Sequence, residues 1–290
     1  DYQRHYSDTK NTVCNVLEGL AEKYPDSEFT IALTGSGAMS ASKFLDLPFI
    51  QEVVSCKRAV EKYIPKTDVV IELGGEDAKI IYFDKSIEQR MNGSCAGGTG
   101  AFIDQMASLL NTDPTGLNEL AKNYQTIYPI ASRCGVFAKT DIQPLLNEGA
   151  AKEDIAVSIF QAVVNQTISG LACGRPIRGN VAFLGGPLNY LSELRKRFIE
   201  TLNLTPEQVI VPEEAHLLVA KGAALDSVEE AKPITVEKLK SKIGVLKVSH
   251  DDTSNPLAPL FSIEADYEEF KARHDKDKVE RADLKTFEGD

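Results

Sequence analysis

The spacing of apolar residues along the chain predicts an alternation of helices and strands. Residues 9–24 carry apolar side chains every three or four positions, which is typical of a helix with one buried face. Residues 29–35 are a short apolar, β-branched run ending in glycine, which predicts a strand. Further helices are predicted at residues 36–47, 56–63, 99–110, 116–124, 132–146, 153–173, 187–202 and 215–225, and further strands within 68–83 and at 85–91, 180–186 and 208–213. Strands that alternate with helices indicate an α/β architecture.

Three predicted strands run into glycine-containing turns. The segments are "TGSGAMS" (residues 34–40), "ELGGEDAK" (72–79) and "FLGGPLNYLSELR" (183–195). Glycine lets backbone N–H groups approach an anion closely, and a helix start adds free N–H groups. Three such turns predict a nucleotide enclosed from several sides, although neither a Walker loop nor a GxGxxG fingerprint is present. The alternative interpretation is an ordinary hairpin turn at 74–75 and an ordinary helix entry at 185–186.

Charged residues follow the second of these turns. Glu76, Asp77 and Lys79 are placed to act on a bound metal–phosphate group if the turn holds one. The alternative is that all three are solvated charges on a hairpin.

Two of the five cysteines share one local context. Cys95 and Cys134 each stand just before a predicted helix, where free N–H groups favour a thiolate. Cys14, Cys56 and Cys173 are interpreted as small buried side chains. An odd number of widely spaced cysteines indicates reduced thiols in a cytoplasmic protein.

A metal site built from these two thiols would need a second chain. Zinc and iron–sulfur clusters usually take four protein ligands, and two identical chains on a two-fold axis would supply four. Plain packing remains the alternative for both thiols. Cysteine–histidine hydrolase chemistry is less favoured, because none of the four histidines lies near a cysteine in the sequence.

The bulk properties exclude two classes of partner. The 290 residues have a net charge of −11 and a pI of about 5.0, which argues against binding to nucleic acid or to an anionic membrane surface. No run in the sequence approaches the roughly 18 apolar residues of a membrane-spanning helix. Residues 227–290 are rich in charge and predict a linker toward a further domain, with a solvated terminal helix and tail as the alternative.

Four motifs in this order resemble one known family. They are "ELGGEDAK", "MNGSCAGGTGAFID", "SRCGVFAKTD" and "FLGGPLN". They resemble the activators of 2-hydroxyacyl-CoA dehydratases, also called CoA-substrate-specific enzyme activases, which are related to the ATPase subunits of benzoyl-CoA reductases. The resemblance covers about residues 30–225. It implies the actin-like ATPase fold of two ribonuclease-H-like lobes, shared with sugar kinases, heat-shock chaperones and actin.

The resemblance also implies a division of the chain. Residues 1–67 would be the remainder of the first lobe, 68–212 the second lobe with the cluster cysteines, 213–226 a helix returning to the first lobe, and 227–290 a charged extension or linker. The family's first phosphate loop is absent. The first lobe is therefore expected to be truncated, and nucleotide binding to be weakened.

The function that the resemblance implies is ATP-dependent donation of one electron. A [4Fe-4S] cluster would lie at a homodimer interface, held by Cys95 and Cys134 of each chain. ATP or ADP with Mg²⁺ would lie between the lobes, and Glu76 and Asp77 would be catalytic. The cofactor-binding residues would be Gly74, Gly75, Lys79, Gly97, Gly98, Gly100, Gly185 and Gly186.

The implied partners are a 2-hydroxyacyl-CoA dehydratase or related reductase and a low-potential donor such as ferredoxin or flavodoxin, in the cytoplasm. Two alternatives remain open. One is a small-molecule kinase of the amino-sugar type on the same fold, and the other is a non-catalytic scaffold domain.

Overall fold

A computed structural model describes residues 2–6, 8–84, 87–92, 97–132, 134–249 and 258–279. The chain divides into two compact units, Asp1–Ser249 and His250–Asp290, which are described separately.

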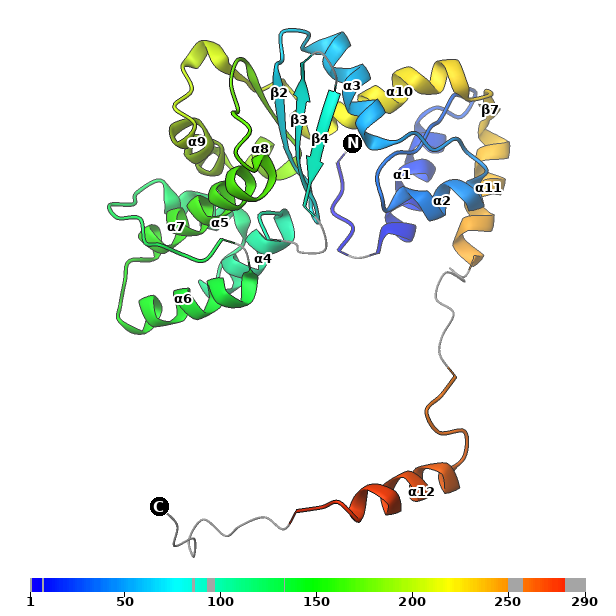
Figure 1. Cartoon of the computed structure of the whole chain (residues 1–290). Helices are drawn as coiled ribbons and strands as arrows, with labels where there is room; N and C mark the ends of the chain where they lie inside the picture. The colour runs from blue at the N-terminus through cyan, green and yellow to red at the C-terminus, as the bar shows by residue number, and fades with distance from the viewer. Residues whose placement is uncertain are drawn as a thin grey trace, which may run out of the picture. The chain divides into compact units, whose positions relative to one another are not determined.

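A five-stranded mixed sheet is the centre of the first unit (Figure 1). The strands are β2 (Val69–Leu73), β3 (Ala78–Phe83), β4 (Ile87–Met91), β5 (Val181–Leu184) and β6 (Val209–Ile210), in the order β4-β3-β2-β5-β6. β2, β3 and β4 pair in antiparallel fashion, whereas β2, β5 and β6 are parallel. The predicted pair of strands around the two glycines is confirmed.

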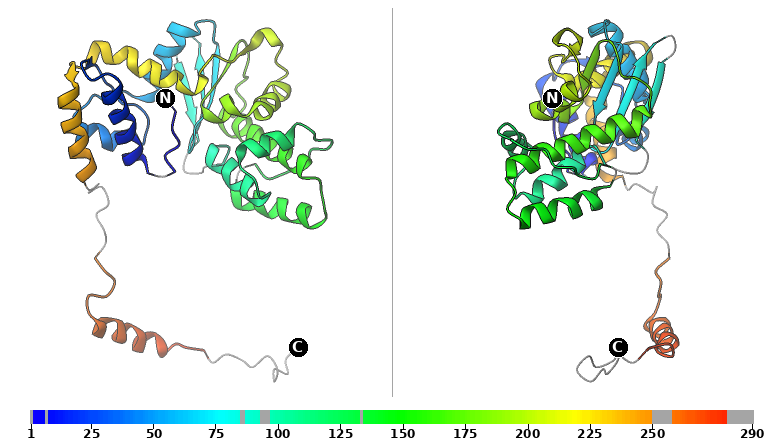
Figure 2. Two further views of the ribbon diagram at one scale, coloured as in Figure 1. Left: turned by 180° about the vertical axis from the view of Figure 1, so that it is seen from behind. Right: turned by 60° about the vertical axis from the view of Figure 1, so that its left-hand side comes forward.

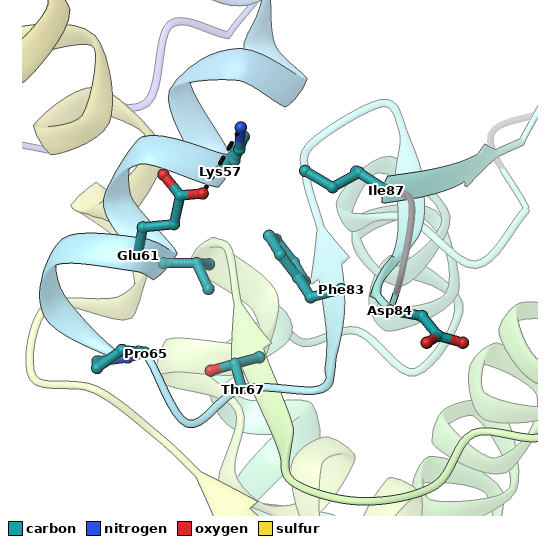
Figure 3. Close-up of a pocket in the computed structure, with 8 residues that line it drawn as sticks. Lys57, Glu61, Pro65, Thr67, Phe83, Asp84 and Ile87 are labelled. Carbon is teal, nitrogen blue, oxygen red and sulfur yellow. Dashed lines mark ion pairs between the residues drawn. The ribbon is translucent and has the colours of Figure 1, made fainter.

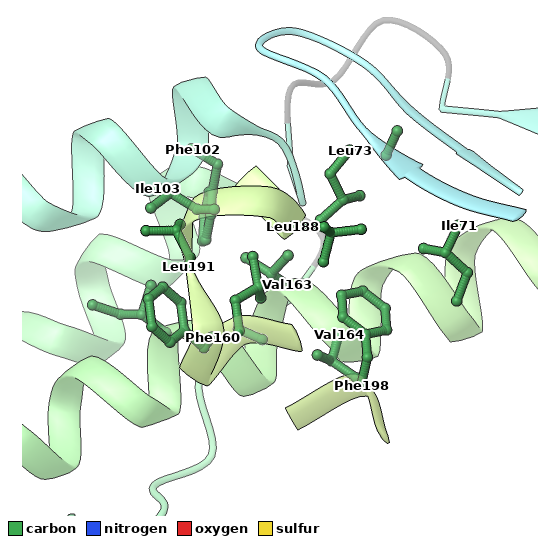
Figure 4. Close-up of a cluster of buried hydrophobic side chains, with 14 of the residues drawn as sticks. Ile71, Leu73, Phe102, Ile103, Phe160, Val163, Val164, Leu188, Leu191 and Phe198 are labelled. Atoms are coloured by element: carbon green, nitrogen blue, oxygen red, sulfur yellow. The ribbon is translucent and has the colours of Figure 1, made fainter. Parts of the chain in front are cut away.

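Helices cover both faces of this sheet. The larger core lies between the sheet and α4 (Gly100–Leu109), α5 (Pro114–Ala121), α6 (Gly135–Asn147), α7 (Lys152–Asn165) with its π-helical continuation η1 (Gln166–Ala172), α8 (Gly186–Tyr190) and α9 (Ser192–Thr201). Figure 4 shows Phe160, Val163 and Val164 in this core with Ile71 and Leu73 of β2. On the opposite face lie α3 (Glu52–Tyr63), the short helix η3 (Ala215–Leu217) and α10 (Leu218–Glu230), and a further short helix, η2 (Pro206–Gln208), precedes β6.

A separate hydrophobic cluster forms the other part of the first unit. It joins α1 (Thr9–Lys23), α2 (Ala38–Leu45) and α11 (Val236–Val248), with a ribbon of β1 (Glu28–Phe29) and β7 (Ile234–Thr235) beside them. α10, yellow in Figure 2, runs from the sheet toward this cluster, and the Ser227 hydroxyl lies 3.3 Å from the Thr30 carbonyl oxygen.

The predicted linker at 227–290 is wrong in its first part. α10 continues to Glu230, and α11 packs on α1 and α2 with Leu239 and Ile243 almost fully buried. The reason is that Lys238, Lys240 and Lys247 of α11 are exposed, so a high fraction of charge coexists with a buried apolar stripe.

Three other predicted elements differ in extent. The strand at 29–35 is reduced to β1 and an isolated bridge between Leu33 and Phe49. The helix expected from residue 56 begins at Glu52. The helix expected at 187–202 is divided into α8 and α9 at Leu191, whose extended backbone lets its side chain enter the core.

The segment Lys152–Ala172 is long and apolar enough to cross a membrane, contrary to the prediction that no run in the sequence approaches this length. Most of it is buried in the larger core, as in the central helix of a globular protein. Within the described part of the second unit, α12 (Glu264–Asp275) has no buried residue.

Candidate functional site

The glycine-containing turns meet around one cavity of about 630 Å³ in the first unit. Gly35 lies on one side, Gly74 and Gly75 form part of the wall at the end of β2, and Gly185 and Gly186 lie at the end of β5. Cavities of a few hundred to about 1,000 Å³ are typical of small-molecule sites. The three turns therefore lie around one common space, and a nucleotide enclosed by them stays a prediction.

Close backbone contacts surround the glycines at the end of β5 and at the start of α4. Gly185 has a φ of +89°, and a Cβ atom there would lie 2.0 Å from the carbonyl oxygen of Leu73. A Cβ atom on Gly100 would lie 3.2 Å from the carbonyl oxygen of Gly74. These glycines therefore allow the end of β5 and the start of α4 to approach the end of β2.

The start of α4 is hydrogen-bonded to the two-glycine turn. The N–H of Gly100 donates to the carbonyl oxygen of Gly74 at 3.0 Å, and the N–H of Ala101 donates to that of Gly75 at 2.7 Å. These two hydrogen bonds join the two-glycine turn to the first turn of α4.

Carboxylates line the cavity, and the sequence indicated only one of them. Glu76 lies on the wall as expected, together with Glu52, Glu72 and Asp104. Asp77 is not among the described lining residues, and its carboxylate forms an ion pair with Lys79 at 2.9 Å.

Glu72 is the most deeply buried of these carboxylates. Its Oε2 atom has no hydrogen-bond partner among the described residues, and burial raises the pKa of its carboxyl to about 7, against the opposing effect of the Lys79 ammonium. A charged residue inside the apolar strand "VVIEL" was the signal that sequence reasoning missed.

A group of aromatic side chains also lines the cavity. The ring centroids of Tyr190 and His216 are 5.1 Å apart, and the Tyr2 ring lies 5.4 and 5.3 Å from them. Burial lowers the pKa of His216, whose Nδ1 atom has no hydrogen-bond partner in the part of the chain that the structure describes. Arg4 forms an ion pair with Asp104 across the same cavity at 2.5 Å.

The expected cofactor-binding residues are therefore only partly together. The described cavity wall includes Gly74, Gly75, Gly100, Gly185 and Gly186 but not Gly97, Gly98 or Lys79.

A second pocket of similar volume lies between α3 and the β3–β4 end of the sheet (Figure 3). Phe83 and Val60 contribute apolar surface, and Lys57 and Glu61 form an ion pair at its rim. Of the predicted site residues that the structure describes, none lines this pocket.

The two predicted cluster cysteines cannot be compared directly, because Cys95 lies outside the described residues. Cys134 is partly exposed at the residue before α6, where the N–H groups of Phe137 and Val136 lower the pKa of its thiol. A Cβ atom on Gly135 would lie 3.7 Å from the Phe102 ring of α4. The starts of α4 and α6 are thus adjacent.

The remaining cysteines have different surroundings. Cys14 and Cys56 are buried and burial raises the pKa of both thiols, whereas Cys173 is exposed, contrary to the expectation for that residue. Cys173 follows η1 with a left-handed backbone, which turns its side chain out of the core. Within the described ranges, no group of three or more histidine, cysteine, aspartate or glutamate side chains is arranged to hold a metal ion.

The chain is similar to several activator proteins. It is 34% identical over 206 residues to the 2-hydroxyisocaproyl-CoA dehydratase activator of Clostridioides difficile, covering 70% of this chain and 74% of that protein. It is also 34% identical over 178 residues to the (R)-2-hydroxyglutaryl-CoA dehydratase activating ATPase of Acidaminococcus fermentans, covering 60% of this chain and 67% of the relative.

Solved structures give the same picture. The Clostridium difficile activator with bound ADPNP superposes with a TM-score of 0.65 at 29% identity, over 81% of this chain and 84% of that one. Component A of the Acidaminococcus fermentans (R)-2-hydroxyglutaryl-CoA dehydratase gives a TM-score of 0.61 at 27% identity, over 72% of this chain and 76% of that one. The fold is the expected actin-like ATPase fold. Because the family profile matches residues 4–227, the chain belongs to the BadF/BadG/BcrA/BcrD ATPase family.

Proposed function

We propose that the protein is an ATP-dependent one-electron donor that activates a partner dehydratase or reductase acting on a CoA thioester. Relatives that carry the names of dehydratase activators support this role. The observation that carries the proposal is the continuous connection from the two-glycine turn, through the start of α4, to Cys134 at the start of α6.

ATP or ADP with Mg²⁺ would occupy the cavity between the glycine turns. The glycines of these turns line the cavity and leave room for a phosphate close to the backbone, and a relative has been solved with ADPNP bound. Glu76 lies on the cavity wall as a group that could act on the phosphates. Asp77 would contribute through Lys79 rather than by direct contact.

A [4Fe-4S] cluster shared by two copies of the chain is the second part of the proposal. Cys134 fits as a ligand because it is partly exposed and its pKa is lowered by neighbouring N–H groups, which favours the thiolate. Cys95 lies outside the described residues and is proposed as the second ligand because it precedes α4 in the sequence, as Cys134 precedes α6, and the starts of these two helices are adjacent. Two such pairs on a two-fold axis would complete the four-thiolate set of a cluster that, when bound, exchanges one electron.

The exposed apolar side chains beside Cys134 suit an interface. Val136 is 69% exposed and Phe137 is 65% exposed, although both are apolar. Burial of these side chains against a second copy would remove them from water and bring the two sets of thiols together.

Exchange of the bound nucleotide would change the position of the cysteine-bearing helix starts through contacts within the protein. A γ-phosphate at Gly74 and Gly75 would favour a particular position of this turn, and the hydrogen bonds to Gly100 and Ala101 would carry the change into α4. The start of α6 would follow because Phe102 packs beside Gly135. A ferredoxin or flavodoxin as electron donor, and a cytoplasmic location, complete the proposal.

Anaerobic reconstitution tests this function. The wild-type protein and the variants Cys95→Ser, Cys134→Ser and Cys173→Ser, the last as matched control, are incubated with iron and sulfide. The molecular mass of each protein in solution is measured to identify dimers, and bound iron is quantified. We expect about four irons per dimer for wild type and the control, and loss of most iron in the other two variants. Equal iron in all four proteins, or a wild-type dimer without iron, would exclude the cluster and leave a kinase or a scaffold.

A further inference from the structure

Lys79 is an ammonium group buried within the first unit. Only 1% of the residue is exposed, and it belongs to the largest fully buried side chains. Its Nζ atom lies 2.9 Å from Asp77 Oδ2, 2.9 Å from Glu52 Oε1 and 3.7 Å from Glu72 Oε1. These carboxylates come from the turn after β2, the first turn of α3 and β2 itself. One ammonium therefore connects three separate segments.

The ammonium lies behind the described cavity wall and not on it. Lys79 was expected to contact phosphate, but it does not line the described cavity wall, whereas two of its partners, Glu52 and Glu72, do. The alternation along β3 explains this position, because Lys79 and Ile81 point toward α3 while Ala78 and Ile80 point into the larger core.

The cluster contains three carboxylates and one ammonium. The neighbouring carboxylates raise the pKa of Lys79, which keeps it charged. Burial raises the pKa of Glu72 to about 7, the carboxylates of Glu52 and Asp77 contribute in the same direction, and Lys79 acts to lower it. The Cys56 thiol of α3 interacts electrostatically with Glu72 and Lys79, and burial raises the pKa of this thiol. Glu72 is thus the member of the cluster that changes charge near neutral pH.

We propose that Lys79 is a positioning residue of the candidate nucleotide site: its ammonium does not bind phosphate but holds the two-glycine turn against α3 and keeps the Glu72 carboxylate oriented beside the cavity. The inference rests on the proposed function for the identity of the ligand. The cluster geometry itself does not depend on that identity.

The first measurement follows the Glu72 carboxyl directly. Protein labelled with ¹³C at the glutamate carboxyl carbon is titrated by NMR, and the Glu72 signal is assigned by its absence in Glu72→Gln. Lys79→Met removes the ammonium and keeps an unbranched side chain, so the midpoint of the Glu72 titration should rise by about one pH unit or more. Glu52→Gln removes a neighbouring carboxylate, so the midpoint should fall.

Opposite signs separate this role from simple structural damage. A lysine with only a packing role would give variants whose midpoints shift in the same direction or not at all, and that result would overturn the proposal. If Lys79→Met does not fold, the double variant Lys79→Met/Glu52→Gln is titrated instead, because it removes one positive and one negative charge. If neither folds, Glu52→Gln alone decides, because an unchanged midpoint overturns the proposal.

The second measurement separates positioning from direct phosphate binding. ADP affinity is measured by calorimetry for the same variants and for Lys79→Arg. Positioning predicts that adding Glu52→Gln to Lys79→Met restores part of the lost affinity and that Lys79→Arg retains most of it. Equal affinity losses in the single and double variants would indicate a phosphate ligand instead. If the wild-type protein binds no ADP, the proposed function fails, while the NMR titration still decides the role of Lys79.

Discussion

Gly185→Ala should destabilise the first unit and remove nucleotide binding together. Gly185 has a φ of +89° and a ψ of 163°, a backbone region that is open essentially only to glycine, so alanine there costs about 1–3 kcal/mol. The new Cβ atom would also lie 2.0 Å from the carbonyl oxygen of Leu73, roughly 1.5 Å closer than an ordinary contact of about 3.5 Å. Leu73 is fully buried at the end of β2, which pairs with β5, so neither strand can move alone.

Overpacking of this kind costs about 1–3 kcal/mol. The total expected loss in the free energy of unfolding is therefore about 2–6 kcal/mol for Gly185→Ala. Gly149→Ala is the matched control, because Gly149 has a φ of +80° and no atom of the described residues lies within 4 Å of the position that an alanine Cβ would take. That control should lose only the backbone contribution of about 1–2 kcal/mol.

Urea denaturation followed by circular dichroism measures both losses, and calorimetry measures ADP affinity. We expect ADP affinity to fall at least about tenfold in Gly185→Ala, which corresponds to about 1.4 kcal/mol, and to stay unchanged in Gly149→Ala. If the two variants differ by less than about 0.5 kcal/mol in unfolding free energy, the close approach of β5 to β2 does not constrain this turn, and the reasoning is refuted.

Three further predictions follow from burial and local charge. Iodoacetamide at pH 7 should alkylate Cys134 several-fold faster than the exposed Cys173, because N–H groups lower the pKa of the Cys134 thiol, and equal rates by mass spectrometry would contradict this. Leu239→Ala should cost about 2–5 kcal/mol of unfolding free energy, whereas Val245→Ala on the exposed face of α11 should cost little; equal losses in urea would show that α11 does not pack as described. The pKa of Glu72 is raised from 4.5 to about 7 on folding, so its stabilising contribution is complete below pH 4.5 and is lost as pH rises to 7. Glu72→Gln should remove this contribution, so the difference between the wild-type and variant stability curves should change by about 3 kcal/mol over that range, and parallel curves would contradict the assignment.

The elements that could be predicted from sequence are those whose signal is local. β2, β3 and β5 are apolar runs beside glycine turns, and each was predicted because a buried strand must be apolar on both faces. α11 was missed although Leu239, Ile243 and Leu246 have helical spacing, because the surrounding lysines suggested a solvated linker. Tertiary packing determines that this segment is a helix with a buried face, and its overall charge did not predict that structure.

The carboxylates of the site show what a local pattern cannot supply. The sequence shows Glu72 as a charged residue within an apolar strand. Its ammonium partner, Lys79, is brought to it by the pairing of β2 with β3, and the Glu52 carboxylate by the packing of α3. The likeness of "GGEDAK" to a phosphate loop suggested that Lys79 and Asp77 face the ligand. The alternation of β3 turns the lysine toward α3 instead, and the aspartate follows it.

Cys134 is the opposite case, because the property that makes it a candidate ligand is contained in its own sequence neighbourhood. The N–H groups that lower its pKa belong to Phe137 and Val136, close after it at the start of α6, so a helix beginning at Gly135 is sufficient. In the proposed cluster the number of thiols that meet would not be local, because it would depend on a second copy of the chain and on burial of the Val136–Phe137 surface against it. Thiolate character should therefore persist in a monomer, whereas iron binding should require the dimer, and measuring alkylation and iron content across a dilution series would separate the two.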